Sequence, residues 1–391
     1  MYTEQFLPEI ELRKSKIQES LRMTKADAIL INDNANLFYT SGRVFSGYTY
    51  VSARGEIYFF VRRPVGLKGD NVIYIRKPED IPSEMQKHGI PLPEKLLLED
   101  DSLTYNERLR LSAIFPNAAI SNGTPLIRNV RTLKTPYELK LIRESGTKHA
   151  MMYHRIPMTY KEGMSDTEFS IELERLARLH GSLGIFRIFG SSMEIYMGSL
   201  IAGDNADVPS PYDFAMGGAG NSTSLPVGSS GMLIRPGMTV MVDMGGNFTG
   251  YMSDMTRVFS LGEIPELALN AHQVALNIEK TIAGKAKPGV AAKDLYNLAV
   301  EMAEQAGLSE YFMGHRQQAG FIGHGIGIEI NERPVLAPRS KDILQENMVF
   351  ALEPKFVIPH VGAVGVENTF IVTRNGVEKV TNCTEEIVSL D

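Results

Sequence analysis

Five residues in the second half of the chain are of types that hold divalent metal ions. Carboxylate oxygens and imidazole nitrogens suit Mn²⁺, Co²⁺ and Fe²⁺, and they also accept Zn²⁺. Together they predict a hydrolytic site with two divalent ions, and the sequence leaves the identity of these ions open. The five candidate ligands are Asp243, Asp254, His324, Glu353 and Glu367.

The first two carboxylates stand on either side of a glycine-rich turn, in TVMVDMGGNFTGYMSDMTR. A symmetric hairpin centred between Phe248 and Thr249 would place Asp243 directly opposite Asp254, with their Cβ atoms about 5 Å apart. Two carboxylates at that distance repel each other, and a bound cation removes the repulsion. The hairpin therefore predicts a cation site.

A second predicted hairpin, which turns near Pro359–Gly362, repeats the arrangement with two glutamates. Glu353 and Glu367 stand in the apolar segments VFALEPK and VGVENTF. Glutamate is almost never fully buried unless it is paired, so these positions are more informative than a surface carboxylate would be. Two divalent ions would neutralise the four carboxylates, and His324, in the glycine-rich GFIGHGIGIEI, would add a neutral nitrogen ligand.

An internal repeat relates the two hairpins. The segments Lys161–Gly181 and Lys287–Gly307 have equal length, and each holds an amphipathic helix between glycines. Met238 precedes Asp243 by five residues, and Met348 precedes Glu353 by five. We therefore expect two similar halves that face each other across a pseudo-two-fold axis and bring the four carboxylates together.

The first part of the chain predicts a separate α/β unit, because strand-like and helix-like segments alternate. We expect a helix in EIELRKSKIQESLRM, a strand in ADAILI, a turn in NANLFYTSG, a strand in EIYFFVRR, and a strand–helix pair within Lys95–Ser121. Pro136, capped by Thr135, begins a further long helix. The prediction is a mixed α/β fold with one domain at residues 1–128 and a catalytic domain at residues 129–391.

Composition excludes several classes of protein. The net charge of the 391 residues is −6 and there is no basic stretch, which disfavours a nucleic-acid partner. Cys383 is the single cysteine, so an intramolecular disulfide is impossible, and a reducing, cytoplasmic location is expected. No apolar run approaches about 18 residues and the N-terminus has no signal-peptide pattern, so no membrane association is expected.

These motifs resemble the metallopeptidase family of methionine aminopeptidase, aminopeptidase P, prolidase and creatinase. DMGGNFTGYMSDMTR, GHGIG, LEP and ENT are similar to the family's ligand motifs in order, and RTLKTPYELKLIR is similar to its domain junction. The resemblance covers nearly the whole chain. It implies a creatinase-type N-terminal domain, a catalytic domain with the pita-bread fold, and a homodimer. The N-terminal unit favours the aminopeptidase P and prolidase branch.

The resemblance also implies a role for each ligand. Asp243 would bind one metal, and His324 and Glu353 the other, while Asp254 and Glu367 would bridge the two. A hydroxide between the metals would attack the scissile carbonyl, because metal binding lowers the pKa of water from 15.7 to as low as about 7. Glu353 would also move the proton.

The sequence departs from the family at three accessory positions where its peptidases carry histidines. Val227, Asn331 and Gly320 stand there instead. General acid–base help of this kind is typically worth about 10²–10⁴ in rate, so the usual preference for Xaa-Pro peptides is open. Arg333 and Arg339 are candidates for binding a substrate carboxylate, although an arginine in a loop is more often solvated.

Three hypotheses follow. The first is a metal-dependent aminopeptidase or dipeptidase that cleaves a short peptide with proline at the second position. The second, suggested by the missing histidines, is a lyase or an amidinohydrolase on the same fold. The third is a peptide-binding module without catalysis, which the intact ligand set disfavours because four clustered carboxylates without metal would be costly.

Overall fold

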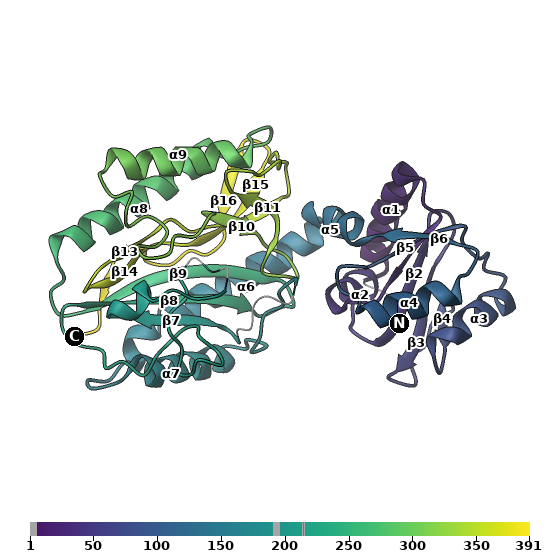
Figure 1. Ribbon diagram of the computed structural model, residues 1–391, viewed down its shortest axis with the longest axis horizontal. Helices are drawn as coiled ribbons and strands as arrows, with labels where there is room; N and C mark the ends of the chain where they lie inside the picture. The colour runs from purple at the N-terminus through teal and green to yellow at the C-terminus, as the bar shows by residue number, and fades with distance from the viewer. Residues whose placement is uncertain (1–5, 191–195, 213, 215) are drawn as a thin grey trace. The chain divides into compact units, whose positions relative to one another are not determined.

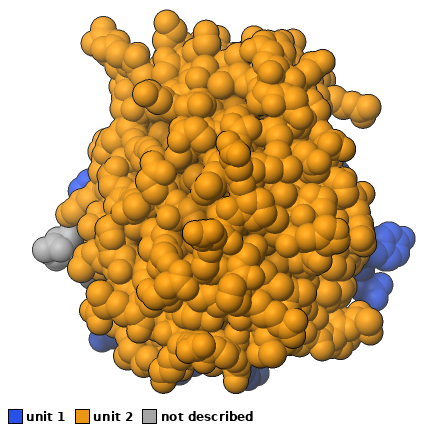
Figure 2. Space-filling model, turned by 90° about the vertical axis from the view of Figure 1, so that its left-hand side faces the viewer, with its two compact units in different colours: residues 1–131 blue, residues 132–391 orange. Residues whose placement is uncertain are grey.

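The computed structural model describes residues 6–190, 196–212, 214 and 216–391. The chain divides into two compact units, Met1–Arg131 and Thr132–Asp391. The surface of the second unit is drawn in orange in Figure 2. The domain boundary predicted after residue 128 falls inside helix α5, which runs from Thr124 to Thr132.

The first unit is built on a six-stranded mixed sheet in the order β4-β3-β2-β1-β5-β6 (Figure 1). β1 pairs antiparallel with β2 and parallel with β5, and this mixture of directions agrees with the prediction. β1, with the sequence AILI, is buried along its whole length. The strands are β1 (Ala28–Ile31), β2 (Ser46–Ser52), β3 (Ile57–Arg63), β4 (Val72–Tyr74), β5 (Lys95–Leu98) and β6 (Ala119–Asn122).

One prediction in this unit is wrong, because NANLFYTSG forms a helix rather than a turn. α2 runs from Asn34 to Ser41. The Asp33 side chain caps it by accepting a hydrogen bond from the Ala35 N–H at 2.8 Å, and Gly42 ends it at a φ of 73°. An acidic cap and a terminal glycine define a short helix as well as they define a turn. The unit's other α-helices are α1 (Leu7–Thr24), α3 (Ile81–Lys87) and α4 (Tyr105–Ile114).

The second unit contains two similar halves, as the internal repeat predicted. Each half has two helices followed by three antiparallel strands, in the spatial orders β7-β8-β9 and β10-β12-β15. α6 and α7 contact the three strands of the first half, whereas α8 and α9 contact further strands of the second half, described below (Figure 1). The repeated segments form α7 and α9, each of 14 residues. The helices are α6 (Pro136–Tyr153), α7 (Asp166–Leu179), α8 (Glu266–Lys285) and α9 (Ala292–Gln305).

The remaining strands extend these two sheets. β17 is added to the edge of the first, and β11 and β16 are added to the edges of the second. β13 and β14 form a separate two-stranded ribbon beneath α8. The strands are β7 (Gly198–Ala202), β8 (Met238–Asn247), β9 (Met252–Leu261), β10 (Gly323–Gly325), β11 (Glu332–Leu336), β12 (Val349–Leu352), β13 (Lys355–Ile358), β14 (Gly362–Gly365), β15 (Asn368–Thr373), β16 (Gly376–Lys379) and β17 (Val388–Ser389).

Two hydrophobic clusters stabilise the halves. One joins α8 and α9 to the ribbon and the second sheet, and the other joins α6 and α7 to β7, β8 and β9. α6 begins where the sequence predicted, because Thr135 and Glu138 form a reciprocal capping box around Pro136. Within the described part of the chain, no helix has the length and apolar character needed to cross a membrane.

Candidate metal centre

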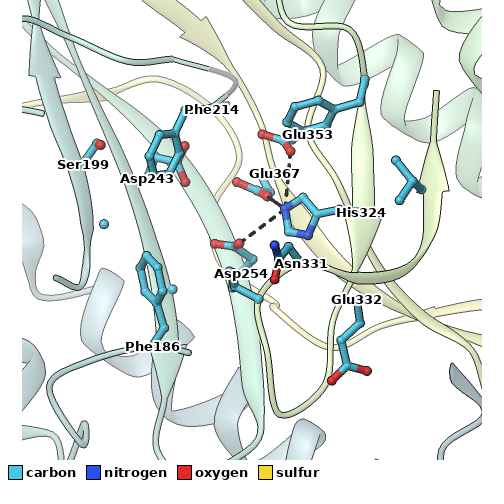
Figure 3. A pocket seen from close by; sticks show the side chains of 15 residues that line it. Phe186, Ser199, Phe214, Asp243, Asp254, His324, Asn331, Glu332, Glu353 and Glu367 are labelled. Carbon is cyan, nitrogen blue, oxygen red and sulfur yellow. Dashed lines mark ion pairs between the residues drawn. The ribbon is translucent and has the colours of Figure 1, made fainter. Parts of the chain in front are cut away.

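The five predicted ligands lie around one cavity of about 270 Å³ in the second unit (Figure 3). Asp243 is on β8, Asp254 on β9 and His324 on β10, while Glu353 directly follows β12 and Glu367 directly precedes β15. Both halves of the repeat therefore contribute carboxylates to the same space. Asp254, Glu353 and Glu367 are buried, and the other two side chains are partly exposed.

The register of the first hairpin differs from the prediction. Asp243 pairs with Thr256, and Asp254 pairs with Gly245, so the two aspartates are diagonal neighbours on the same face. The strands end at the pair formed by Asn247 and Met252, which moves the centre of the turn one residue further along the chain. Gly250, with a φ of 87°, supplies the turn conformation and donates a hydrogen bond to Asn247 Oδ1 at 3.1 Å.

The diagonal arrangement opens the space that a cation needs. Directly opposite Asp254 stands Gly245, which has no side chain to fill the cavity. A Cβ atom at Gly245 would meet the Phe186 ring at 2.8 Å. The glycine therefore lets the aromatic ring approach the strand, and it leaves the Asp254 carboxylate facing the cavity.

The second hairpin has the predicted register. β12 pairs with β15 through Leu352 and Asn368, and β13 pairs with β14 through Lys355 and Gly365. Both pairings belong to one continuous register. Glu353 and Glu367 fall between the two ladders, where backbone pairing gives way to side chains that point into the cavity (Figure 3).

His324 faces three of the carboxylates. Its Nε2 atom lies 3.5 Å from Glu353 Oε1, 3.7 Å from Asp254 Oδ2 and 4.0 Å from Glu367 Oε1 (Figure 3). These separations are longer than good direct hydrogen bonds. Several ligand atoms that surround a shared point at such spacing suit a cation at that point.

A sixth residue, Lys355, belongs to the centre, and the sequence analysis missed it. Its Nζ atom lies 2.7 Å from Glu353 Oε2, 2.8 Å from Asp243 Oδ2 and 3.3 Å from Glu367 Oε2. Its side chain has no exposed surface. A signal was present in the sequence, because residues two apart on a strand share a face, and Lys355 follows Glu353 by two.

The proximity of these groups perturbs their pKa values. Burial, and then the charge of Asp243, raises the pKa of Asp254 well above its usual range. Burial and Asp254 do the same to the pKa of Glu367. Burial would lower the pKa of Lys355, but the carboxylates of Asp243, Glu353 and Glu367 outweigh it and raise that pKa well above its usual value. Lys355 is therefore an ammonium ion at neutral pH.

Two overlapping groups of side chains have ligand atoms close enough to hold an ion. One consists of Asp254, His324 and Glu367, and the other of Asp243, Glu353 and Glu367, with all atoms of a group within 4.8 Å of one another. The oxygen-rich donor set with one imidazole fits a divalent metal ion. The first group fits as it stands, whereas the second already surrounds the Lys355 ammonium.

Hydrogen bonds between β9 and β15 hold the Glu367 carboxylate and the backbone of the predicted ligands. The Thr256 hydroxyl donates to Glu367 Oε2 at 2.7 Å, and the Thr369 hydroxyl accepts from the Asp254 N–H at 2.8 Å. The buried Arg257 guanidinium donates to the Glu367 carbonyl at 2.9 Å and to Asn368 Oδ1 at 2.9 Å. These contacts tie β9 of the first half to β15 of the second, and such outer partners normally tune a metal site.

The wall of the cavity away from the carboxylates is mostly apolar. Ser199 also lines the cavity, and its buried hydroxyl has no hydrogen-bond partner among the described residues. A wall of this kind suits an apolar substrate side chain, with the hydroxyl available to a polar atom. The apolar side chains are Phe186, Phe214, Phe321, Ile330 and Val335.

Asn331 lines the cavity, but its amide is engaged by the backbone. Its Oδ1 accepts from the Phe189 N–H at 2.8 Å, and its Nδ2 donates to the Phe189 carbonyl at 2.9 Å. The neighbouring Ile330 N–H donates to the Arg187 carbonyl at 2.8 Å. Asn331 therefore holds the segment that carries Phe186, which is a positioning role rather than the direct substrate contact predicted from the sequence.

The other predicted substrate residues do not line the cavity. The Arg333 guanidinium pairs with Asp342, and Arg339 is exposed. Val227 is half-buried in a loop outside the lining, and Gly320 is exposed immediately before Phe321. On β11, Glu332 faces the cavity and contacts Lys134 at 3.0 Å, whereas the neighbouring Arg333 is held by Asp342.

The comparisons with known proteins follow this geometry. Residues 140–374 match metallopeptidase family M24, and residues 13–133 match the creatinase/prolidase N-terminal domain. The chain belongs to metallopeptidase family M24. This membership confirms the predicted family and the predicted enzyme class, a hydrolase.

Similar proteins span the whole chain. An Xaa-Pro dipeptidase of Pyrococcus horikoshii is 27% identical over 383 residues, which cover 95% of this chain and 97% of the relative. An uncharacterized peptidase of Bacillus subtilis is 26% identical over 391 residues, with 97% and 100% covered.

Solved structures share the fold. The Xaa-Pro dipeptidase from Bacillus anthracis superposes with a TM-score of 0.79 at 23% identity, and 97% of this chain and 99% of that chain are covered. The prolidase from Pyrococcus horikoshii gives a TM-score of 0.77 at 22% identity, with 96% and 100% covered. The predicted fold, a creatinase-type N-terminal domain followed by a pita-bread domain, is confirmed.

Proposed function

We propose that this chain is a divalent-metal-dependent peptidase that removes the N-terminal residue from short peptides with proline in the second position. One observation carries the proposal: four carboxylates and an imidazole meet on one side of a cavity of about 270 Å³, opposite an apolar wall. The volume lies near the lower end of the range for small-ligand sites, which suits a substrate as small as a dipeptide. The Xaa-Pro dipeptidases among the relatives support the same substrate class.

The chemistry divides between the two sides of the cavity. A divalent ion, when bound, polarises the scissile carbonyl and makes water a better nucleophile. Asp254, His324 and Glu367 would hold it. Glu353 Oε1 faces the same space as His324 Nε2, at 3.5 Å, and is the group we assign to accept a proton from water and return it to the leaving nitrogen.

The apolar wall would bind the proline ring and the first side chain. Phe186, Phe214 and Phe321 offer aromatic faces and edges to an apolar ring. No arginine or lysine occurs among the described residues that line the cavity. A free substrate carboxylate would therefore find no side-chain cation there, and we expect C-terminal amides to be cleaved about as well as free acids.

The experiment tests a panel of peptides as substrates. The full chain is loaded with Mn²⁺ or Co²⁺, and its metal content is measured. The panel holds Xaa-Pro and Xaa-Ala dipeptides, Xaa-Pro-Yaa tripeptides and the corresponding amides, and the released amino acid is quantified by mass spectrometry. We expect Xaa-Pro peptides to be cleaved and Asp254→Asn to lose at least about 100-fold in kcat/KM, because it removes a metal ligand. Release of no amino acid by metal-loaded protein would contradict the proposal.

A second candidate is hydrolysis of a small non-peptide molecule, such as an amidino compound, by the same metal centre. The observation in its favour is that His324 is the only histidine among the described residues lining the cavity, although related peptidases are expected to use more. Turnover of a guanidino or amide substrate by protein that cleaves no peptide in the panel would favour this candidate.

A further inference from the structure

The side chain of Lys355 occupies a place in the centre where the sequence predicted a metal ion. Its three carboxylate partners are Asp243, Glu353 and Glu367, at 2.8, 2.7 and 3.3 Å from Nζ. These same three residues form one of the two groups with ligand atoms close enough to hold an ion. The ammonium thus stands where the second cation would stand.

The two glutamates divide their oxygen atoms between two positions. Oε2 of Glu353 and Oε2 of Glu367 face the ammonium, at 2.7 and 3.3 Å. Oε1 of each faces His324 Nε2, at 3.5 and 4.0 Å. Both carboxylates therefore connect the ammonium to the space beside His324, in the manner of ligands that connect two cations.

The fold makes room for this lysine. Gly365 stands opposite Lys355 in the β13–β14 ladder and has a φ of 144°. A Cβ atom at Gly365 would meet the Lys355 Cα at 2.7 Å and its Cγ at 3.1 Å. On the other side, the Met313 N–H donates to the Lys355 carbonyl at 2.8 Å. The side chain of Lys355 has no exposed surface, so the ammonium is held among the carboxylates.

Charge leaves room for one further divalent ion without a change of sign. Four carboxylates and one ammonium sum to −3, one divalent ion reduces this to −1, and a second would make the centre positive, at +1. A second divalent ion would also have to stand within a few ångströms of the buried ammonium, where the repulsion between like charges is poorly screened by solvent.

We propose that the centre binds a single divalent ion at Asp254, His324 and Glu367, with the Lys355 ammonium as a permanent second cation. The inference rests on the proposed function for its choice of a divalent metal, but it concerns stoichiometry rather than turnover. Lys355 would hold Asp243 and the outer oxygens of both glutamates in place, and the ion would act on the substrate from the other side.

The test is a metal titration of the full chain. Protein freed of metal with a chelator is titrated with Mn²⁺, and the electron paramagnetic resonance signal of free Mn²⁺ gives the number of ions bound. We expect one ion per chain, with the spectrum of an isolated Mn²⁺. Two ions per chain, or the exchange-coupled spectrum of a pair, would overturn the inference.

Lys355→Ala provides the complementary measurement, because it removes both the charge and the stem. We expect the number of Mn²⁺ ions bound by this variant to rise from one to two, with the exchange-coupled spectrum of a pair. Lys14→Ala is the matched control: it removes another buried lysine, paired with Glu56 at 3.0 Å in the first unit, and the number of Mn²⁺ ions bound should stay at one. A folded Lys355→Ala protein that still binds one ion would overturn the inference, and if that variant does not fold, the wild-type count decides.

The two proposals fail separately. Wild-type protein that binds two ions and cleaves peptides overturns the single-ion centre and leaves the peptidase. Wild-type protein that binds one ion and cleaves no peptide overturns the peptidase and leaves the single-ion centre. Protein that binds no Mn²⁺ overturns both.

Discussion

At the scale of single residues, the centre depends on side chains that position others as much as on the ligands. Asn331 is an example, because both ends of its amide are bonded to the Phe189 backbone. Its position is one where related peptidases are expected to carry a histidine. Here the residue fixes the segment that carries Phe186, and the proposed proton transfer is assigned to Glu353 instead.

We predict that Asn331→Ala raises KM for the preferred peptide by about tenfold, equivalent to about 1.4 kcal/mol, with a smaller change in kcat. The physical reason is that the loss of two hydrogen bonds frees the segment carrying Phe186 without touching the ligands. Each lost bond is worth about 1 kcal/mol, so the midpoint of thermal unfolding should also fall by a few degrees.

Steady-state kinetics and a thermal melt on the same preparations measure both effects. The matched control is Asn382→Ala, because Asn382 lies on the exposed surface, away from the cavity, where its side chain donates a hydrogen bond to the Lys379 carbonyl at 3.2 Å. An Asn331→Ala enzyme with an unchanged KM would show that the wall does not depend on this amide.

Residue types revealed most of the centre from the sequence alone. Carboxylates in apolar strands are rare enough to be noticed, and so Glu353 and Glu367 could be predicted. Lys355 was harder, because a lysine beside a turn is usually solvated, and only the burial of its whole stem distinguishes it. The arginines were misleading, because their charge suggested a contact with a substrate carboxylate. Arg333 instead pairs with Asp342, and Arg339 is exposed.

At the scale of secondary structure, the placement of side chains depends on register, which sequence specifies only in part. The repeat predicted the two hairpins and their contents. The second hairpin had the expected register, whereas the first was shifted because Gly250 and Asn247 define a turn further along the chain. The shift keeps both aspartates on one face, so the two predicted ligands still lie at the same cavity.

A buried carboxylate in the first unit connects strand ends in a comparable way. Glu99 directly follows β5 and accepts hydrogen bonds from the Asn32 and Asp33 N–H groups, which follow β1, at 2.6 and 2.7 Å. Burial raises the pKa of Glu99 to about 7 from an ordinary value of 4.5. The Asp33 charge adds to the rise, and the hydrogen bonds oppose it.

We predict that this unit loses stability as the pH rises from about 4.5 to about 7. The folded pKa is raised, so the stabilising contribution is fully present below pH 4.5 and is lost as the pH passes through the folded pKa. The difference of 7 − 4.5 = 2.5 units corresponds to about 3 kcal/mol at most.

Urea denaturation followed by circular dichroism at pH 5 and pH 8 measures how the free energy of unfolding changes with pH. Glu99→Gln cannot ionise, so its free energy of unfolding should change less between the two pH values than that of the wild type, whatever its absolute stability. The exposed Glu19→Gln serves as the control. If the free energy of unfolding changed equally between the two pH values in the wild type and in Glu99→Gln, the raised pKa of Glu99 would not be the cause.

At the scale of the whole molecule, the chemistry belongs to one unit. Every described residue that lines the cavity falls between Phe186 and Glu367, inside the second unit. The two-domain organisation could be predicted because strand-like and helix-like segments alternate in the first part of the chain, whereas the candidate metal ligands all stand in the second part. The homodimer implied by the family resemblance stays a prediction. The internal repeat explains why the candidate ligands could be predicted from the sequence, since each half repeats the carboxylate positions of the other.

Metal binding should therefore stabilise the second unit alone. An ion that binds only the folded state adds about 2.7 kcal/mol when its concentration is 100 times Kd. Because the ligands stand on β8, β9 and β10 and beside β12 and β15, we predict slower amide hydrogen exchange in these strands when Mn²⁺ is added. Amides of β1 and β5 in the first unit should exchange at an unchanged rate.

Hydrogen exchange with mass spectrometry, with and without a chelator, measures both sets of amides in one experiment, and Asp254→Asn should abolish the difference. Protection that appears equally in both units would show that the metal acts on the whole chain, and protection in neither would place the ion elsewhere than at these ligands.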